Sequence, residues 1–240
     1  MSGHSKWATI HRQKEVKDAK RGAAFTKLGR AITIAVKEGG GLGDPDKNFK
    51  LRLAVDRARQ LNMPKENITR AIDRASGAGG EELHSAMYEG FLPGGAVVLV
   101  QTLSDNHLRA AQEVRGVLDK NGGNLGGARS VSYLFASQGE VVVAAKTAIG
   151  IDDQELELMD VGVTDIQREE SSFVLHCDPK QTFTVKERVE QLGYTVESAE
   201  LVMHPATLVT VDAATQAKIE SVLEKLEDLD DVQKVWTNYA

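Results

Sequence analysis

The spacing of apolar residues changes once along this chain, and that change constrains the fold more than any other feature. Up to about residue 76, apolar residues recur at steps of three and four, which is the period of a helix packed on one face. From about residue 88 onward, short apolar runs and alternating stretches are separated by glycine and proline, which is typical of strands joined by turns and helices. The 240 residues suffice for two or three domains. The sequence therefore predicts an α+β protein with a helical first part.

The first part contains three segments with a helical pattern. One helix is expected over residues 14–38 and ends at the glycines 39–41. A second is expected over 45–61, and a third begins at Pro64, since proline is well tolerated at the first position of a helix. Together they predict a three-helix domain over residues 1–78.

The segment 139–203 has the pattern strand, helix, strand, strand, helix, strand. The expected elements are 140–145, 152–160, 164–169, 172–177, 184–192 and 194–202. This order is that of a complete ferredoxin-like βαββαβ domain.

The residues on either side of that segment each supply half of another such domain. Before it, a short strand 88–91 is expected ahead of Pro93-Gly94-Gly95, and the pattern then predicts strand 96–103, a helix to about residue 120, and strand 131–135. After it come strand 207–211, helix 213–228 and strand 231–236. Two half-sheets would leave exposed edges, so we predict one discontinuous domain, 79–137 plus 204–240, into which a second ferredoxin-like domain, 138–203, is inserted. The alternative is three consecutive domains with incomplete flanking sheets.

The charges are divided unevenly. Residues 1–78 hold 17 Lys and Arg against 8 Asp and Glu, a net +9, whereas the remaining residues hold 12 against 27. A basic block of this size attracts phosphates, and the acidic remainder would orient the molecule on a polyanion. The alternatives are solubility alone, or neutralisation of the basic domain by the acidic one.

The basic residues cluster in an N-terminal arm and on the first helix. An arm with cations and one aromatic suits phosphate contact and stacking, although Trp7 could instead anchor the helices. The candidate nucleic-acid-binding residues are Lys6, Trp7, His11, Arg12, Lys14, Lys17, Lys20, Arg21, Lys27 and Arg30. Because these are chiefly Lys and Arg, we expect contacts that are mostly independent of base sequence.

A second candidate contact is a glycine-rich loop after the helix that ends near residue 120. Its glycines exceed what a helix cap needs, so its amides could approach a phosphate or RNA backbone; a long flexible connection is the equal alternative. The candidate residues are Gly122, Gly123, Asn124, Leu125, Gly126, Gly127, Arg129 and Ser130.

The sequence shows no catalytic constellation. The six histidines are scattered without metal-binding spacing, and Cys177 follows His176 on an expected strand, so the two side chains point to opposite faces. Neither glycine-rich stretch has the context of a nucleotide-binding loop. We therefore expect no catalytic residue, no metal, no cofactor and no small-molecule substrate.

No apolar run approaches the ~18 residues of a membrane span, and no signal segment is evident, so no membrane and a cytoplasmic location are expected.

Several motifs, in order along the whole chain, resemble those of the YebC/PmpR family. They are Gly3-His4-Ser5-Lys6-Trp7-Ala8, Asp18-Ala19-Lys20-Arg21-Gly22, Phe25-Thr26-Lys27-Leu28, Asn62-Met63-Pro64-Lys65-Glu66-Asn67-Ile68, Tyr88-Glu89-Gly90, Pro93-Gly94-Gly95, Glu113-Val114-Arg115, and Gly122-Gly123-Asn124-Leu125-Gly126 with Ser130-Val131. Ala128-Arg129 departs from the small residues usual before Ser130.

This resemblance implies a helical domain and two α/β domains. It also implies a probable transcriptional regulator that binds DNA. Relatives that activate mitochondrial translation, or act on ribosomes stalled at proline-rich stretches, imply ribosomal or messenger RNA and the ribosome as alternative partners. The leading hypothesis is thus a non-enzymatic nucleic-acid-binding regulator of gene expression. The alternatives are a ribosome- or RNA-associated translation factor and an acidic protein-interaction adaptor.

Overall fold

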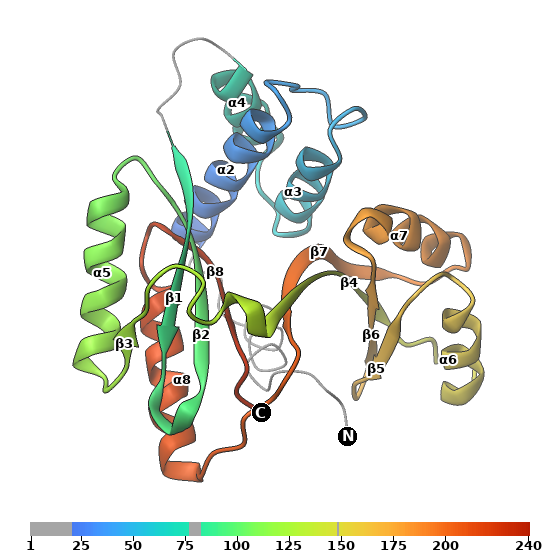
Figure 1. The fold of residues 1–240 in the computed structure, drawn as a ribbon. Helices are drawn as coiled ribbons and strands as arrows, with labels where there is room; N and C mark the ends of the chain where they lie inside the picture. The colour runs from blue at the N-terminus through green and yellow to red at the C-terminus, as the bar shows by residue number, and fades with distance from the viewer. Residues whose placement is uncertain (1–20, 77–82, 148) are drawn as a thin grey trace. The chain divides into compact units, whose positions relative to one another are not determined.

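The computed structural model describes residues 21–76, 83–147 and 149–240 (Figure 1). Contacts divide the chain into two compact units. The first contains most residues up to 136 together with 204–240, and the second contains 137–203. Each unit is described by itself. The fold class is confirmed as α+β, with N-terminal helices and two four-stranded sheets. The predicted three-domain boundaries stay a prediction.

Three helices begin the first unit. Helix α2 spans Arg21–Glu38, α3 spans Phe49–Gln60 and α4 spans Lys65–Ser76, so the three predicted helices are confirmed where the structure describes them. Helix α2 packs against both of the others. The apolar core between them is formed by Ile32, Ala35, Val36, Leu51, Val55, Ala58, Met63, Ile68 and Ala75.

Asn48 fastens the end of α2 to the start of α3. Its side-chain oxygen caps α3 by accepting from the Leu51 amide at 3.1 Å. Its amide nitrogen donates to the carbonyls of Ala35 at 2.8 Å and Leu42 at 3.2 Å. A Cβ on Gly39 would lie 2.1 Å from that nitrogen, so the glycine run that ends α2 also makes room for this clamp.

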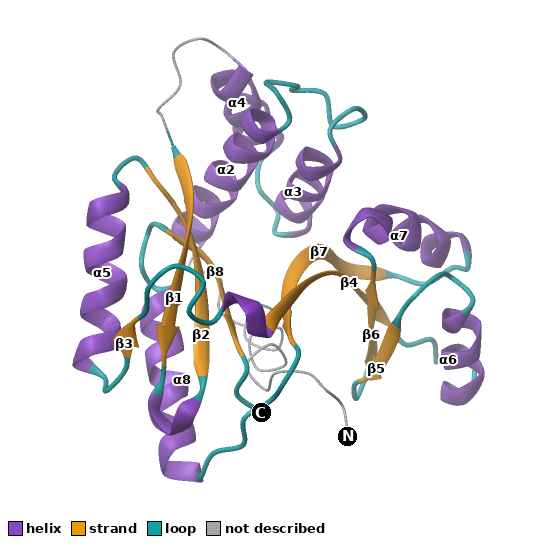
Figure 2. Ribbon diagram, viewed as in Figure 1, coloured by secondary structure: helices purple, strands orange, loops and turns teal. Residues whose placement is uncertain are grey.

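The sheet of the first unit has the strand order β3-β1-β2-β8, and all three pairings are antiparallel. Helices α5 (His107–Lys120) and α8 (Ala213–Glu227) contribute to the core on one face of this sheet, as Figure 2 shows. The strands are β1 (His84–Phe91), β2 (Val97–Ser104), β3 (Asn124–Leu125) and β8 (Val232–Thr237).

The βαββαβ order that was predicted for the sheet of the first unit is wrong. Its four strands include the hairpin β1–β2, paired over eight residues from His84↔Ser104 to Phe91↔Val97, and the short strand β3. The expected strand 131–135 is instead a 3-10 turn, Ser132–Leu134, followed by the start of the next strand. The expected strand 207–211 contributes only the isolated bridge Val209↔Tyr239. The alternation of apolar residues over 131–135 predicted a strand, but Glu89 accepts hydrogen bonds from the Val131 and Ser132 amides at the start of the turn, and the sheet is formed by β3, β1, β2 and β8 without this segment.

The second unit confirms the predicted ferredoxin-like order. Its strand order, β5-β6-β4-β7, is that of a βαββαβ fold, with β6 antiparallel to both β4 and β5. Side chains of both helices enter one core with Val141, Phe173 and Leu175. The elements are β4 (Phe135–Ala144), α6 (Ile151–Met159), β5 (Asp165–Arg168), β6 (Ser172–Cys177), α7 (Thr182–Gln191) and β7 (Val196–Pro205).

The Asn48 clamp yields a stability prediction. Replacing Asn48 with alanine removes the α3 cap and both side-chain donors, and should lower the free energy of unfolding by about 1–3 kcal/mol. Urea denaturation followed by circular dichroism measures this. Gln60→Ala, at the exposed end of the same helix, is the control and should leave the midpoint unchanged. Equal midpoints for the two variants would contradict the assigned role.

Candidate nucleic-acid interface

Most of the predicted arm and first-helix residues cannot be placed. Lys6, Trp7, His11, Arg12, Lys14, Lys17 and Lys20 lie outside the described residues. Arg21 is the first residue of α2, and only its backbone is described. These residues therefore stay predictions.

Lys27 and Arg30, the two predicted cations whose side chains are described, contact an acidic segment of the same unit. The Lys27 ammonium donates to the Glu227 carbonyl, and the Arg30 guanidinium donates to the Asp230 carbonyl at 2.8 Å. Burial lowers the pKa of Lys27, and the neighbouring carboxylates, chiefly Glu227, oppose that shift. Both cations thus have internal partners at residues 227–231.

Asp231 is the centre of that contact. Its side chain is only 4% exposed and pairs with Arg30 at 2.8 Å and Arg109 at 2.9 Å. Ser104 donates a third hydrogen bond, at 2.7 Å. Burial by itself would raise the pKa of Asp231, but these donors outweigh it and the pKa is lowered. One ionised carboxylate therefore joins α2, the end of β2 and α5.

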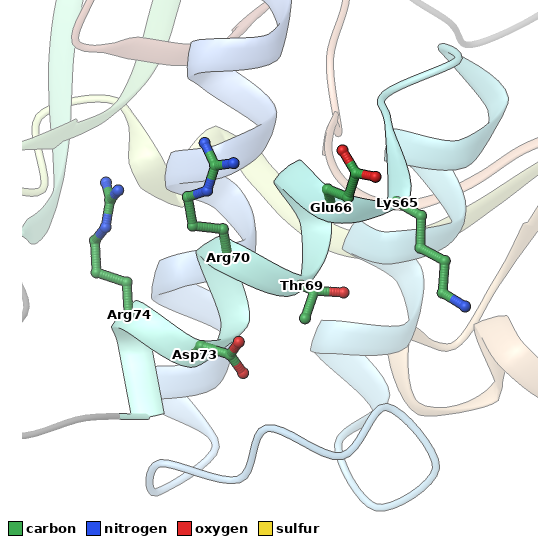
Figure 3. A pocket seen from close by; sticks show the side chains of 6 residues that line it. All are labelled: Lys65, Glu66, Thr69, Arg70, Asp73 and Arg74. Carbon is green, nitrogen blue, oxygen red and sulfur yellow. The ribbon is translucent and has the colours of Figure 1, made fainter.

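Helix α4 presents cations that the sequence analysis missed. Lys65, Arg70 and Arg74 are exposed, and no ion pair engages them within the part of the chain that the structure describes. With Glu66, Thr69 and Asp73 they line a shallow depression on the outer face of α4, where Arg70 and Arg74 extend in the same direction (Figure 3). The available signal was the four-residue spacing of Arg70 and Arg74, off the apolar stripe that contains Ile68 and Ala75.

The glycine-rich loop is folded around a buried carboxylate. Glu89 is 7% exposed. Its two oxygens accept from the backbone N–H groups of Arg129 at 2.7 Å, Val131 at 2.6 Å and Ser132 at 2.8 Å. Burial alone would raise the pKa of Glu89, but the three backbone donors outweigh it and lower the pKa.

This arrangement changes the interpretation of the loop. The Gly126 amide donates to the Glu89 carbonyl at 2.7 Å, and a Cβ on Gly123 would lie 2.5 Å from the Phe91 carbonyl oxygen. The glycines thus permit close packing against β1. Four of the amides expected to meet a phosphate backbone have internal acceptors, namely those of Gly123, Gly126, Arg129 and Ser130. The side chain of Arg129 remains exposed, on a backbone with φ of 65°.

Metal ligands, a reactive thiol and a membrane-spanning helix were looked for among the described residues. Among them, no group of three or more His, Cys, Asp or Glu could hold a metal ion. Cys177 lies in the core of the second unit, and burial raises the pKa of its thiol. None of the described helices is both long and apolar enough to cross a membrane.

The fold and the charge pattern define a class: α+β proteins with a basic helical segment, a four-stranded sheet and an inserted ferredoxin-like unit. Family models place the chain within that class more narrowly. Residues 5–78 match the TACO1/YebC protein N-terminal domain, and residues 83–239 match the TACO1/YebC second and third domain. The chain belongs to the TACO1/YebC family.

Relatives span the whole chain. A protein of Rubrobacter xylanophilus is 44% identical over 100% of this chain and 95% of its own length. A protein of Chloroflexus aurantiacus is 46% identical over 99% of this chain and 95% of its own length. Both are named probable transcriptional regulatory protein. The crystal structure of the conserved hypothetical protein Aq1575 from Aquifex aeolicus is similar with a TM-score of 0.85 and 39% identity, covering 93% of this chain and 91% of that one.

The lowered pKa of Glu89 makes a pH-dependent prediction. A carboxylate with a lowered folded-state pKa contributes its full stability above its ordinary pKa of 4.5, and loses that contribution as the pH falls through the folded value. Glu89→Gln leaves at least one backbone donor unpaired and should cost about 1–3 kcal/mol at pH 7. The difference from the wild type should shrink as the pH falls below about 4.5.

Urea denaturation at a series of pH values checks this, with Glu113→Gln on the exposed face of α5 as the control. A difference between Glu89→Gln and the wild type that stays constant down to pH 3 would refute the role of the ionised carboxylate.

Proposed function

We propose that this chain is a non-enzymatic regulator of gene expression that acts by binding nucleic acid. The observation that carries the proposal is the group of exposed cations on α4, without ion-pair partners among the described residues, in a segment with a net charge of +9. Free, exposed cations neutralise phosphates without first breaking an internal ion pair. The names of the relatives, probable transcriptional regulatory protein, support the regulatory setting.

The chemistry of the surface favours contacts with the phosphate backbone. Lys and Arg side chains on one helix face bind phosphates of either nucleic acid, whereas reading of duplex sequence needs side chains that reach base edges. The proposal therefore covers DNA and structured RNA, and regulation of translation at the ribosome is its second form.

Removing two of the α4 cations tests the proposal. In the full chain, Arg70→Ala with Arg74→Ala should lower affinity for a duplex on the order of tenfold per lost phosphate contact at 0.1 M salt. The slope of log affinity against log salt should become shallower by about 0.9 for each contact. Fluorescence anisotropy over a range of salt concentrations measures both quantities.

The matched control removes two exposed cations from outside the basic segment, Lys180→Ala with Lys218→Ala. It lowers the net charge equally and should leave the slope unchanged. Equal effects of the two double variants would show that only overall charge matters.

The adaptor hypothesis has one specific observation in its favour. Lys27 and Arg30 are held by the acidic segment 227–231, so part of the basic surface is neutralised internally. In the adaptor form, the acidic surfaces bind a partner protein and no nucleic acid is involved. A full chain that binds neither DNA nor RNA at low salt would favour it.

The contact between Arg30 and Asp231 allows a test that distinguishes cations with a structural role from cations that bind nucleic acid. Arg30→Ala leaves Asp231 with fewer donors and should lower the free energy of unfolding by about 1–3 kcal/mol. It should leave the salt slope of nucleic-acid binding unchanged, in contrast to the α4 variant. Denaturation and anisotropy measure the two effects, and a shallower slope for Arg30→Ala would place Arg30 in the interface.

A further inference from the structure

Tyr133 is the most exposed of the large apolar side chains that the structure describes, at 75%. Its neighbours at two-residue spacing, Val131 and Phe135, are 0% and 8% exposed. A strand would have turned all three to one face and buried them together. The 3-10 turn Ser132–Leu134 instead directs the ring of Tyr133 to solvent. The turn is the short helix that leads into β4 in Figure 2.

The backbone around Tyr133 is fixed on both sides. Glu89 binds the amides of Val131 and Ser132, and the Leu134 amide donates to the Val131 carbonyl at 3.0 Å. The Leu134 carbonyl accepts from the amide of Ala206 at 2.8 Å. The aromatic ring is therefore carried on an ordered turn, which reduces the entropy lost when a ligand binds.

The charged side chains of the segment that contains this turn are cationic. Residues 79–240 are strongly acidic, yet residues 120–139 contain no Asp or Glu. Their charged side chains are those of Lys120 and Arg129, and both are exposed. Arg129 has a positive φ of 65°, a conformation that favours glycine, and the Glu89 hydrogen bonds hold it there. The exposed cations of this segment can therefore attract a phosphate without an acidic neighbour within residues 120–139.

We propose that Tyr133 and Arg129 form a contact site for single-stranded nucleic acid. The phenol ring stacks on an unpaired base, and the guanidinium binds a phosphate of the same strand. A duplex offers no free base face except at its ends, so this site distinguishes unpaired from paired segments. The inference rests on the proposed function and deepens it, since it adds a second contact, of different chemistry, to the basic surface of α4.

The test uses the full chain and two labelled probes, a 12-nucleotide oligouridylate and a blunt-ended duplex of similar length without a loop. Stacking on one base typically contributes a factor of about 5 to 150 in affinity. Tyr133→Ala should lose that factor for the oligouridylate and leave duplex affinity unchanged. Tyr133→Phe keeps the ring and should bind as the wild type does. Arg129→Gly, which suits the positive φ, should make the single-strand salt slope shallower by about 0.7.

Leu108→Ala is the matched control, because Leu108 is 65% exposed on another element of the same unit. Unchanged thermal melts of the variants verify that the fold is kept. Wild-type affinity of Tyr133→Ala for oligouridylate overturns the site, and so does an equal loss for the duplex. If the site fails while the α4 variant still weakens salt-sensitive binding, the proposed function stands. If the wild-type chain binds neither probe at low salt, both the single-strand site and the proposed function are wrong.

Discussion

The first unit depends on a buried carboxylate, Asp231, whose ionised state is maintained by three donors from different parts of the chain. Arg30 comes from α2, Ser104 from the end of β2, and Arg109 from α5. A buried charge is tolerated only where such donors satisfy it, and removing one partner leaves the rest uncompensated. The attachment of the basic helix to the sheet and the packing of α5 are therefore linked through one side chain. Two cations of the basic helix, Lys27 and Arg30, are thereby engaged with the acidic segment 227–231.

The charge division that is evident in the sequence serves two purposes in the structure. Some cations of the basic segment, Lys27 and Arg30, are used for internal attachment. Others, on α4, are exposed and have no ion-pair partner among the described residues. A count of charges cannot separate these groups, because the distinction depends on which residues the fold brings together. Nucleic-acid binding, as proposed, therefore depends on the exposed cations of α4 and on the cations of residues 1–20.

A second carboxylate, Glu89, organises the glycine-rich loop. Peptide N–H groups gathered in a tight loop are a common anion-binding arrangement. Here the anion is a side chain of the adjacent strand β1, so the loop is ordered without a ligand. The consequence is a fixed turn from which Tyr133 and Arg129 project, with the acid-free segment around them. Four of the loop's backbone donors are engaged internally, and the proposed contact therefore uses side chains instead.

Periodicity, turn residues and charge are local properties, so the helical and strand periods, the inserted ferredoxin-like unit and the basic character of the first 78 residues could be predicted from the sequence. The turn at 132–134, the hairpin of β1 with β2, and the contacts of Lys27 and Arg30 with residues 227–231 could not, because each depends on residues far apart in the chain. Val131, Tyr133 and Phe135 alternate as a strand would, and the competing turn is favoured by Glu89, more than forty residues away in the sequence. Likewise, Arg30 and Asp231 are two hundred and one residues apart. Long-range hydrogen bonds between buried charges and backbone amides leave no periodic pattern in a sequence, so they appear only once the chain is folded.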